Sequence, residues 1–270
     1  MKRGRLLCLL VILGMFCAAC TKLPQESAAQ PEKPSPAMES ESVPASDLAA
    51  PQPSPEPSGQ VLPLEGLVIG LDPGHQAKGN PQKEPIAPGS SQSKAKVTSG
   101  TQGRWSGVPE YEVNLQVALR LRELLEAQGA TVVMTREQNE VDISNIERAQ
   151  FFNEHETDYA LRLHCNGAED EAEHGAFAII PSEGEYQEES ESAAKLLIDA
   201  FCAETGAENR GVICMDNQTG FHWCQRMILT VEMGYMSNRQ EDAMLADADY
   251  QEKMAQGLCQ GILRYYQEQE

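Results

Sequence analysis

Short apolar runs alternate with longer amphipathic stretches along residues 61–270. The apolar runs have the length of buried strands, and the amphipathic stretches carry apolar residues three or four positions apart, as on one face of a helix. Strands that alternate with helices are typical of an α/β fold with parallel strands. The predicted strands are 67–72, 130–135, 158–164, 175–180 and 227–232, and the predicted helices are 109–128, 144–153, 188–204 and 248–268.

Residues at the ends of two predicted helices support their boundaries. Pro109 suits the first position of a helix, and Gly129 suits the position just after its end. Ser144 is a candidate N-cap for the helix that follows.

The stretch 77–108 has no periodicity and is rich in Gly, Ser, Lys and Pro. Loops of this length inside a domain are usually functional or disordered. Because the stretch directly follows His75 and Gln76, we expect an irregular loop at the rim of a site.

The first 20 residues have the features of an export signal. A basic start precedes an apolar run from Leu6 to Ala19, which is short for a membrane-spanning helix but suits the apolar region of a signal. The segment 1–20 ends in CAAC, which resembles the lipobox of bacterial lipoproteins, with Cys20 as the lipidated residue, although Cys17 replaces the usual Leu. An ordinary cleaved signal and a retained membrane helix are the alternatives.

Residues 21–60 predict a disordered tether, since they hold nine of the 16 prolines and no aromatic residue. The remaining stretch, 61–270, has a plausible length for one domain. We therefore expect an exported protein at the outer face of the cytoplasmic membrane, anchored through Cys20, or secreted if the lipobox is not used. Nucleic acid is not an expected partner, because the net charge is −20 and phosphate neutralisation requires Lys and Arg.

Reactive side chains lie at the ends of three predicted strands. Asp72 and His75 follow the first strand, His164 ends the third and Glu232 ends the last. In open α/β sheets ligands bind at the carboxyl ends of the strands, so these groups would converge if the strands are parallel and adjacent. A lone histidine at a strand end is nonetheless more often a hydrogen-bonded structural residue than a metal ligand.

The helix at 109–128 adds a fourth candidate group. Its apolar stripe, extended one turn back from Val113, reaches Glu110, so Glu110 should point inward while Glu112 faces solvent. An inward carboxylate is costly unless it is paired or bound to a metal. The alternative is a glutamate that only interacts favourably with the helix dipole.

His75, Glu110 and His164 form the donor set of a catalytic zinc site, in which three protein ligands leave one position open for water. Zinc lowers the pKa of that water and polarises a carbonyl. Glu232, held near the metal without binding it, could pass the water's proton to a leaving amine. The three ligands are too far apart in the sequence for a local zinc motif, so the residues alone do not single out this interpretation.

Five sequence blocks occur in order between residues 66 and 265. They are LDPGH, PEYEVNLQVALRLRELLEAQGATVVMTRE, ISNIERAQFFN, LRLHCNGA and VEMGYMSN. Together they resemble the zinc-dependent N-acetylmuramoyl-L-alanine amidases of the amidase type 3 family.

The resemblance implies a twisted, mostly parallel six-stranded sheet flanked by helices on both faces. It implies hydrolysis of the amide between the lactyl group of N-acetylmuramic acid and L-alanine in peptidoglycan, with one Zn²⁺ ion per domain. The family's zinc ligands fall on His75, Glu110 and His164, and its catalytic glutamate falls on Glu232. The expected partners are peptidoglycan and, through Cys20, the membrane; we expect a monomer, and no substrate-binding residue is assigned.

Cys165 stands where an alanine usually follows the second zinc histidine. Because adjacent residues of a strand point to opposite faces, we expect its thiol to pack away from the site. Asp72 is expected to orient the turn or His75, whereas Arg148 and Arg210 could pair either with internal carboxylates or with the substrate's peptide stem. Two other functions stay open: a non-catalytic wall-binding or sensor lipoprotein, and a zinc carboxypeptidase acting on the stem peptide.

Overall fold

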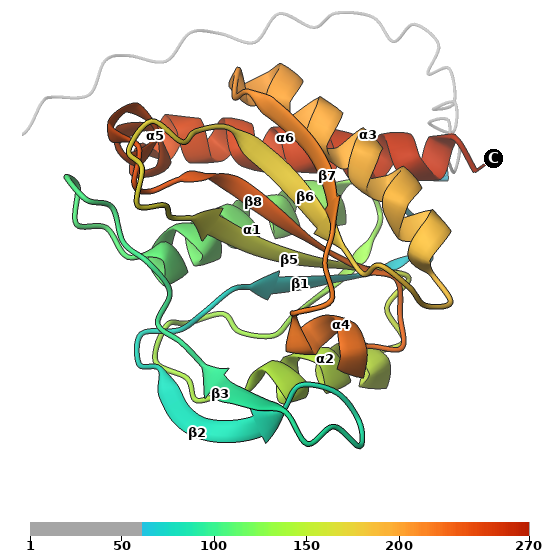
Figure 1. Ribbon diagram of the computed structural model, residues 1–270. Helices are drawn as coiled ribbons and strands as arrows, with labels where there is room; N and C mark the ends of the chain where they lie inside the picture. The colour runs from blue at the N-terminus through green and yellow to red at the C-terminus, as the bar shows by residue number, and fades with distance from the viewer. Residues whose placement is uncertain (1–60, 270) are drawn as a thin grey trace, which may run out of the picture. The chain divides into compact units, whose positions relative to one another are not determined.

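The computed structural model describes residues 61–269 (Figure 1). The predicted export signal with Cys20 (1–20) and the predicted tether (21–60) lie outside the described residues. All nine predicted helices and strands are present, with small shifts at their ends. In chain order, the structure contains β1 (Val68–Pro73), β2 (Asn80–Pro85), β3 (Ser93–Val97), α1 (Glu110–Ala127), β4 (Thr131–Met134), α2 (Asn145–Glu154), β5 (Tyr159–Asn166), β6 (Ala176–Ile180), α3 (Gln187–Thr205), β7 (Asn209–Cys214), α4 (Thr219–Trp223), β8 (Ile228–Tyr235), α5 (Arg239–Leu245) and α6 (Ala248–Gln267).

Six strands form the central sheet, in the order β4-β1-β5-β8-β6-β7. Strands β4, β1, β5 and β8 run parallel to one another, β6 pairs antiparallel with β8, and β7 runs parallel to β6. The predicted mostly parallel six-stranded sheet is therefore confirmed. Because β1, β5 and β8 are adjacent and parallel, their carboxyl ends meet at the same edge of the sheet.

Helices cover both faces of the sheet (Figure 1). On one face, α1, α3 and α6 pack over alternate strand residues that are fully buried, among them Leu71, Leu161 and Leu229. On the other face, α2 and α4 pack over a smaller apolar cluster that includes Phe152 and Phe221. The β2–β3 hairpin lies on the same side of the sheet as α2 and α4. The two faces of the sheet are therefore covered by different elements.

The predicted ends of α1 and α2 are confirmed. Helix α1 begins directly after Pro109, and Gly129 adopts the left-handed conformation (φ 96°) just beyond its end. At α2, the Ser144 hydroxyl accepts the Glu147 N–H (3.2 Å), and the Glu147 carboxylate accepts the Ser144 N–H (2.7 Å). This reciprocal capping box fixes the start of the helix that borders the site.

The expectation of an irregular loop at 77–108 is wrong for part of that segment, where β2 and β3 form an antiparallel hairpin. Most residues of β2 are exposed and the buried one is the polar Glu84, so the strand lacks the apolar alternation that sequence patterns detect. Strand β7, an edge strand with mostly exposed residues, and the short helices α4 and α5 were likewise not predicted. No helix within 61–269 combines the length and apolar character needed to span a membrane.

Candidate metal centre and active site

The turn after β1 carries His75 to the edge of the sheet in the left-handed backbone conformation, with φ 62°. This conformation is uncommon for a residue other than glycine and costs about 1–2 kcal/mol. Two buried guanidinium groups hold the turn. Arg148 donates to the carbonyl oxygens of His75 (2.9 Å) and Pro73 (3.1 Å), and Arg136 donates to those of Pro73 (2.8 Å) and Gly74 (3.1 Å).

Asp72 lies beneath this turn and is fully buried. Its carboxylate accepts hydrogen bonds from Arg148 Nη1 (2.6 Å), Arg162 Nε (3.1 Å) and Thr135 Oγ1 (2.6 Å). Burial by itself would raise the pKa of Asp72, but the two guanidinium groups outweigh it and hold the pKa well below its usual range. Asp72 therefore orients the turn that carries His75, acting through Arg148.

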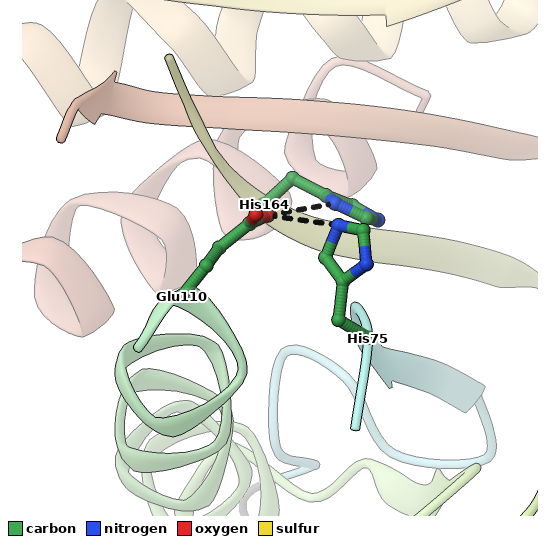
Figure 2. Close-up of side chains that lie close together, drawn as sticks. All are labelled: His75, Glu110 and His164. Atoms are coloured by element: carbon green, nitrogen blue, oxygen red, sulfur yellow. Dashed lines mark hydrogen bonds and ion pairs between the residues drawn. The ribbon is translucent and has the colours of Figure 1, made fainter. Parts of the chain in front are cut away.

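The three predicted zinc ligands converge at the sheet edge (Figure 2). Glu110, the first residue of α1, is 3% exposed and points inward as predicted. Its Oε1 lies 3.2 Å from His75 Nε2 and 3.1 Å from His164 Nδ1. Each of the three residues offers one ligand atom, and these atoms lie within 4.8 Å of one another.

The protonation of the two imidazoles suits a cation at this point. His75 Nδ1 lies 3.0 Å from the carbonyl oxygen of Thr98, and since a carbonyl only accepts, this contact favours the tautomer with the proton on Nδ1 and a lone pair on Nε2, the atom that faces Glu110. Burial lowers the pKa of His164 to about 4, although its hydrogen bond with Glu110 opposes the shift. Neutral imidazole nitrogens facing a carboxylate oxygen repel it unless a proton or a metal ion lies between them.

The Glu110 carboxylate is held in its charged form. Burial raises its pKa, but the close contacts with the His164 and His75 rings outweigh burial, so the pKa lies well below its usual range. The backbone N–H of Thr101 donates to Oε2 (2.9 Å) and that of Cys165 to Oε1 (3.2 Å). Two imidazoles and one carboxylate are a donor set that zinc accepts in catalytic sites, so these residues fit that metal.

Glu232 lies beside this group on β8, directly opposite His164 in the β5–β8 register. Within residues 61–269, its Oε2 is buried without a hydrogen-bond partner, and so is His164 Nε2. Burial raises the pKa of Glu232 well above its usual value, and the negative charge of Glu110 raises it further, while Arg162 opposes both. A carboxylate with a raised pKa at the edge of a cavity is a candidate for proton transfer.

An open cavity of about 590 Å³ gives access to all four predicted residues. The segment 98–101, just after the hairpin, forms one of its walls. Gly100 adopts φ 79°, and a Cβ at this position would lie 2.5 Å from Glu110 Oε2 and 2.8 Å from the His75 ring. Thr98 and Gly100 contact the candidate metal group, and the sequence reasoning missed both; the glycine at a close backbone approach was the available signal.

The remaining sequence candidates lie outside the metal group. The Cys165 sulfur contacts Asn114 Oδ1 (3.6 Å) on the α1 side of the sheet, which confirms that the thiol packs away from the metal group. Arg210 pairs with Glu173 and stacks over the Tyr235 ring. Like Arg148, Arg210 therefore pairs with a carboxylate of the chain itself.

A mostly parallel sheet with a cavity at its edge, a three-residue candidate metal group and a nearby carboxylate defines a hydrolase-like site on an α/β fold. The family model for N-acetylmuramoyl-L-alanine amidase matches residues 69–264, and the chain belongs to this family.

Relatives and solved structures support the same family. The germination-specific N-acetylmuramoyl-L-alanine amidase of Bacillus subtilis is 29% identical over 227 residues, which cover 77% of this chain and 83% of that protein. The amidase Ami1 of Mycobacterium abscessus superposes with a TM-score of 0.69 and 26% identity, over 75% of this chain and 99% of that one. Ami1 of Mycobacterium smegmatis shares the fold, with a TM-score of 0.70 at 24% identity, over 76% of this chain and 99% of that one.

Proposed function

We propose that this protein hydrolyses the amide between N-acetylmuramic acid and L-alanine in peptidoglycan, and that it requires zinc. The observation that carries the proposal is the convergence of His75, Glu110 and His164 beside Glu232, in a chain that belongs to the amidase family. Cell-wall peptidoglycan is accordingly the proposed substrate.

His75, Glu110 and His164 would hold one zinc ion. Zinc with three protein ligands keeps a coordination position open, lowers the pKa of water there and polarises a carbonyl. The Thr98 carbonyl supports this role by accepting a hydrogen bond from His75 Nδ1, which leaves Nε2 free as a ligand.

Glu232 would act as the general base and then as the general acid. Its carboxylate takes a proton from the attacking water and returns that proton to the nitrogen of the leaving L-alanine, whose departure breaks the amide. The buried and unpartnered Oε2 and the raised pKa support a group that can hold the proton between the two steps.

The test measures zinc content and the release of stem peptides from purified muropeptides. Glu232→Gln should retain zinc and lose at least about a hundredfold in kcat, because general acid–base catalysis contributes typically 10²–10⁴-fold. His164→Ala should lose zinc as well as activity. Glu112→Gln is the matched control, since Glu112 is exposed on the same turn of α1, and it should change neither.

Two outcomes would contradict the proposal. If Glu232→Gln keeps full activity, the assignment of Glu232 is wrong; if the wild-type protein binds wall without zinc or turnover, the protein is a non-catalytic wall-binding protein. Mass analysis of the products separates amidase cleavage, which frees the intact stem peptide, from carboxypeptidase cleavage, which shortens it.

We further propose that the protein is exported and anchored through a lipid on Cys20. The basic start, the apolar run and the CAAC segment at the end of residues 1–20 support this proposal. Replacing Cys20 with Ser should move the protein from the membrane fraction to the medium. Retention of Cys20→Ser in the membrane fraction would contradict a lipid anchor.

A further inference from the structure

The β2–β3 hairpin is cationic in a strongly acidic protein. Residues 78–96 hold four lysines and one carboxylate, Glu84, whereas the chain as a whole has a net charge of −20. Glu84 is 5% exposed and accepts the backbone N–H of Ile146 (3.4 Å) at the start of α2, so it fastens the hairpin to that helix. None of the four lysines forms an ion pair within the part of the chain that the structure describes.

Two of these lysines line a groove that leads to the metal centre. Lys83 and Lys94 border a cavity of about 420 Å³ that reaches His75 and His164. Lys94 also borders a second cavity, of about 230 Å³, that reaches His164. The two cavities share Lys94, Asn145 and His164 and form one depression between the hairpin and the start of α2, here called the hairpin groove.

The other groups along the hairpin groove add positive charge and amide groups. The guanidinium of Arg162 and the side chains of Asn217 and Gln218 line it, and Arg162 Nη1 donates to Gln218 Oε1 (2.7 Å). The ammonium of Lys94 donates to the Asn217 carbonyl, which places it across the groove from the hairpin. The lining contains one carboxylate, Glu232, at the catalytic end.

The 590 Å³ cavity on the other side of the metal centre has a different character. Its walls combine neutral hydrogen-bonding groups such as Thr101, Gln102 and Asn166 with one arginine and one further glutamate, Arg104 and Glu169. The metal centre thus lies between a cavity whose lining has more carboxylates than cationic groups and a groove with excess positive charge.

We propose that the hairpin groove binds the acidic stem peptide through its free carboxylates, with Lys94 and Lys83 as specificity-determining residues, and that the glycan lies in the 590 Å³ cavity. This inference rests on the proposed amidase function, because the amide that is cleaved joins an uncharged, hydroxyl-rich glycan to a peptide with several carboxylates. Charge complementarity orients such a substrate across the metal centre and disfavours the reverse orientation. Lysine suits this role, since its ammonium is a point charge on a flexible stem.

The test compares two muropeptides, one with free stem carboxylates and one in which they are amidated. Lys94→Gln should raise KM for the free-acid substrate about tenfold and leave kcat nearly unchanged. A tenfold change is the lower end of the range expected when a hydrogen bond to a charged group is lost. The same variant should leave KM for the amidated substrate unchanged. Lys83→Gln should act in the same direction, and Lys78→Gln, an exposed lysine of the same segment outside the groove, should alter neither substrate.

Three results would overturn the inference. If Lys94→Gln raised KM equally for both substrates, the lysine would only position the hairpin. Equal KM values of the wild-type protein for both substrates would mean that the stem carboxylates are not recognised. If the difference in KM between the two substrates were lost in Arg104→Gln but kept in Lys94→Gln, the stem peptide would lie in the 590 Å³ cavity instead.

A binding measurement separates this inference from the amidase proposal. Calorimetry with the free stem peptide, which contains no amide to the glycan, should show binding that weakens about tenfold in Lys94→Gln or on amidation of the peptide. If this dependence is found in a protein that does not cleave muropeptides, the groove assignment stands and the amidase proposal fails. If the protein cleaves muropeptides but neither Lys94→Gln nor amidation of the peptide weakens binding, the groove assignment fails and the amidase proposal stands.

Discussion

Replacing Asp72 with Asn removes the buried negative charge that Arg148 and Arg162 share. The side chain keeps its shape, but both guanidinium groups, at 2.6 and 3.1 Å, lose their ionic partner, and Arg148 is itself only 2% exposed. Removing one partner of a buried ion pair costs about 3–5 kcal/mol, because the remaining charge stays desolvated and uncompensated. We expect Asp72→Asn to lower the free energy of unfolding by this amount at pH 7.

The pH dependence of this difference follows from the lowered pKa of Asp72. A carboxyl whose pKa is lower in the folded state contributes stability above its unfolded pKa of about 3.9, and this contribution declines as the pH falls toward the folded pKa. The difference between wild type and Asp72→Asn should therefore be constant from pH 7 to about 5. It should shrink by about 1 kcal/mol between pH 4 and pH 3, since each unit of pH changes it by at most about 1.4 kcal/mol.

Urea denaturation followed by circular dichroism measures both quantities. A chelator in every sample keeps metal binding from contributing to the measured stability. Asp199→Asn is the control, because Asp199 is exposed on α3 and, among the described residues, hydrogen-bonds only to the surface amide of Asn209, so its cost should stay within about 0.5 kcal/mol. A cost below about 1 kcal/mol for Asp72→Asn, or a difference that does not change below pH 4, would refute the reasoning.

Three further substitutions test the local geometry. Gly100→Ala should sharply reduce zinc content, because its Cβ would lie 2.5 Å from Glu110 Oε2 and its φ is 79°; unchanged zinc binding would show that the segment can move away. Ser144→Ala should cost about 1 kcal/mol in urea denaturation through loss of the α2 cap, whereas a cost near zero would mean that water replaces the hydroxyl. Cys165→Ala should destabilise the fold by about 1–2 kcal/mol but leave zinc affinity unchanged, and a large fall in affinity would make the thiol a ligand after all.

The groups at strand and helix ends could be predicted from the sequence because their position follows from regular elements. His164 and Glu232 end the predicted strands and lie among the last residues of β5 and β8, and Glu110 continues the apolar stripe of α1 by one turn. Once the strands are parallel and adjacent, these side chains meet at one edge without further information. Local patterns therefore placed each residue at the end of an element, and the family resemblance supplied the mostly parallel sheet that brings these ends together.

The supporting groups could not be predicted because they depend on contacts between distant segments. Asp72 and Arg148 are 76 positions apart, and the sequence left the partner of Arg148 open between an internal carboxylate and the substrate. The contact of Thr98 with His75 depends on the path of the chain through the hairpin, whose exposed strands carry no apolar alternation. Tertiary contacts, rather than local preference, determine both features.

The energies of these contacts explain how a strained residue can serve as a metal ligand. The left-handed conformation of His75 costs about 1–2 kcal/mol, and the turn would relax if nothing opposed it. The ion pair between Asp72 and Arg148 opposes this relaxation, because breaking it would cost about 3–5 kcal/mol. Arg148 also donates a hydrogen bond to the His75 carbonyl, so the ion pair stabilises the turn itself. Because the larger energy comes from the fold, His75 is held in its proposed ligating position without a metal, and metal-binding energy would not be needed to form the turn.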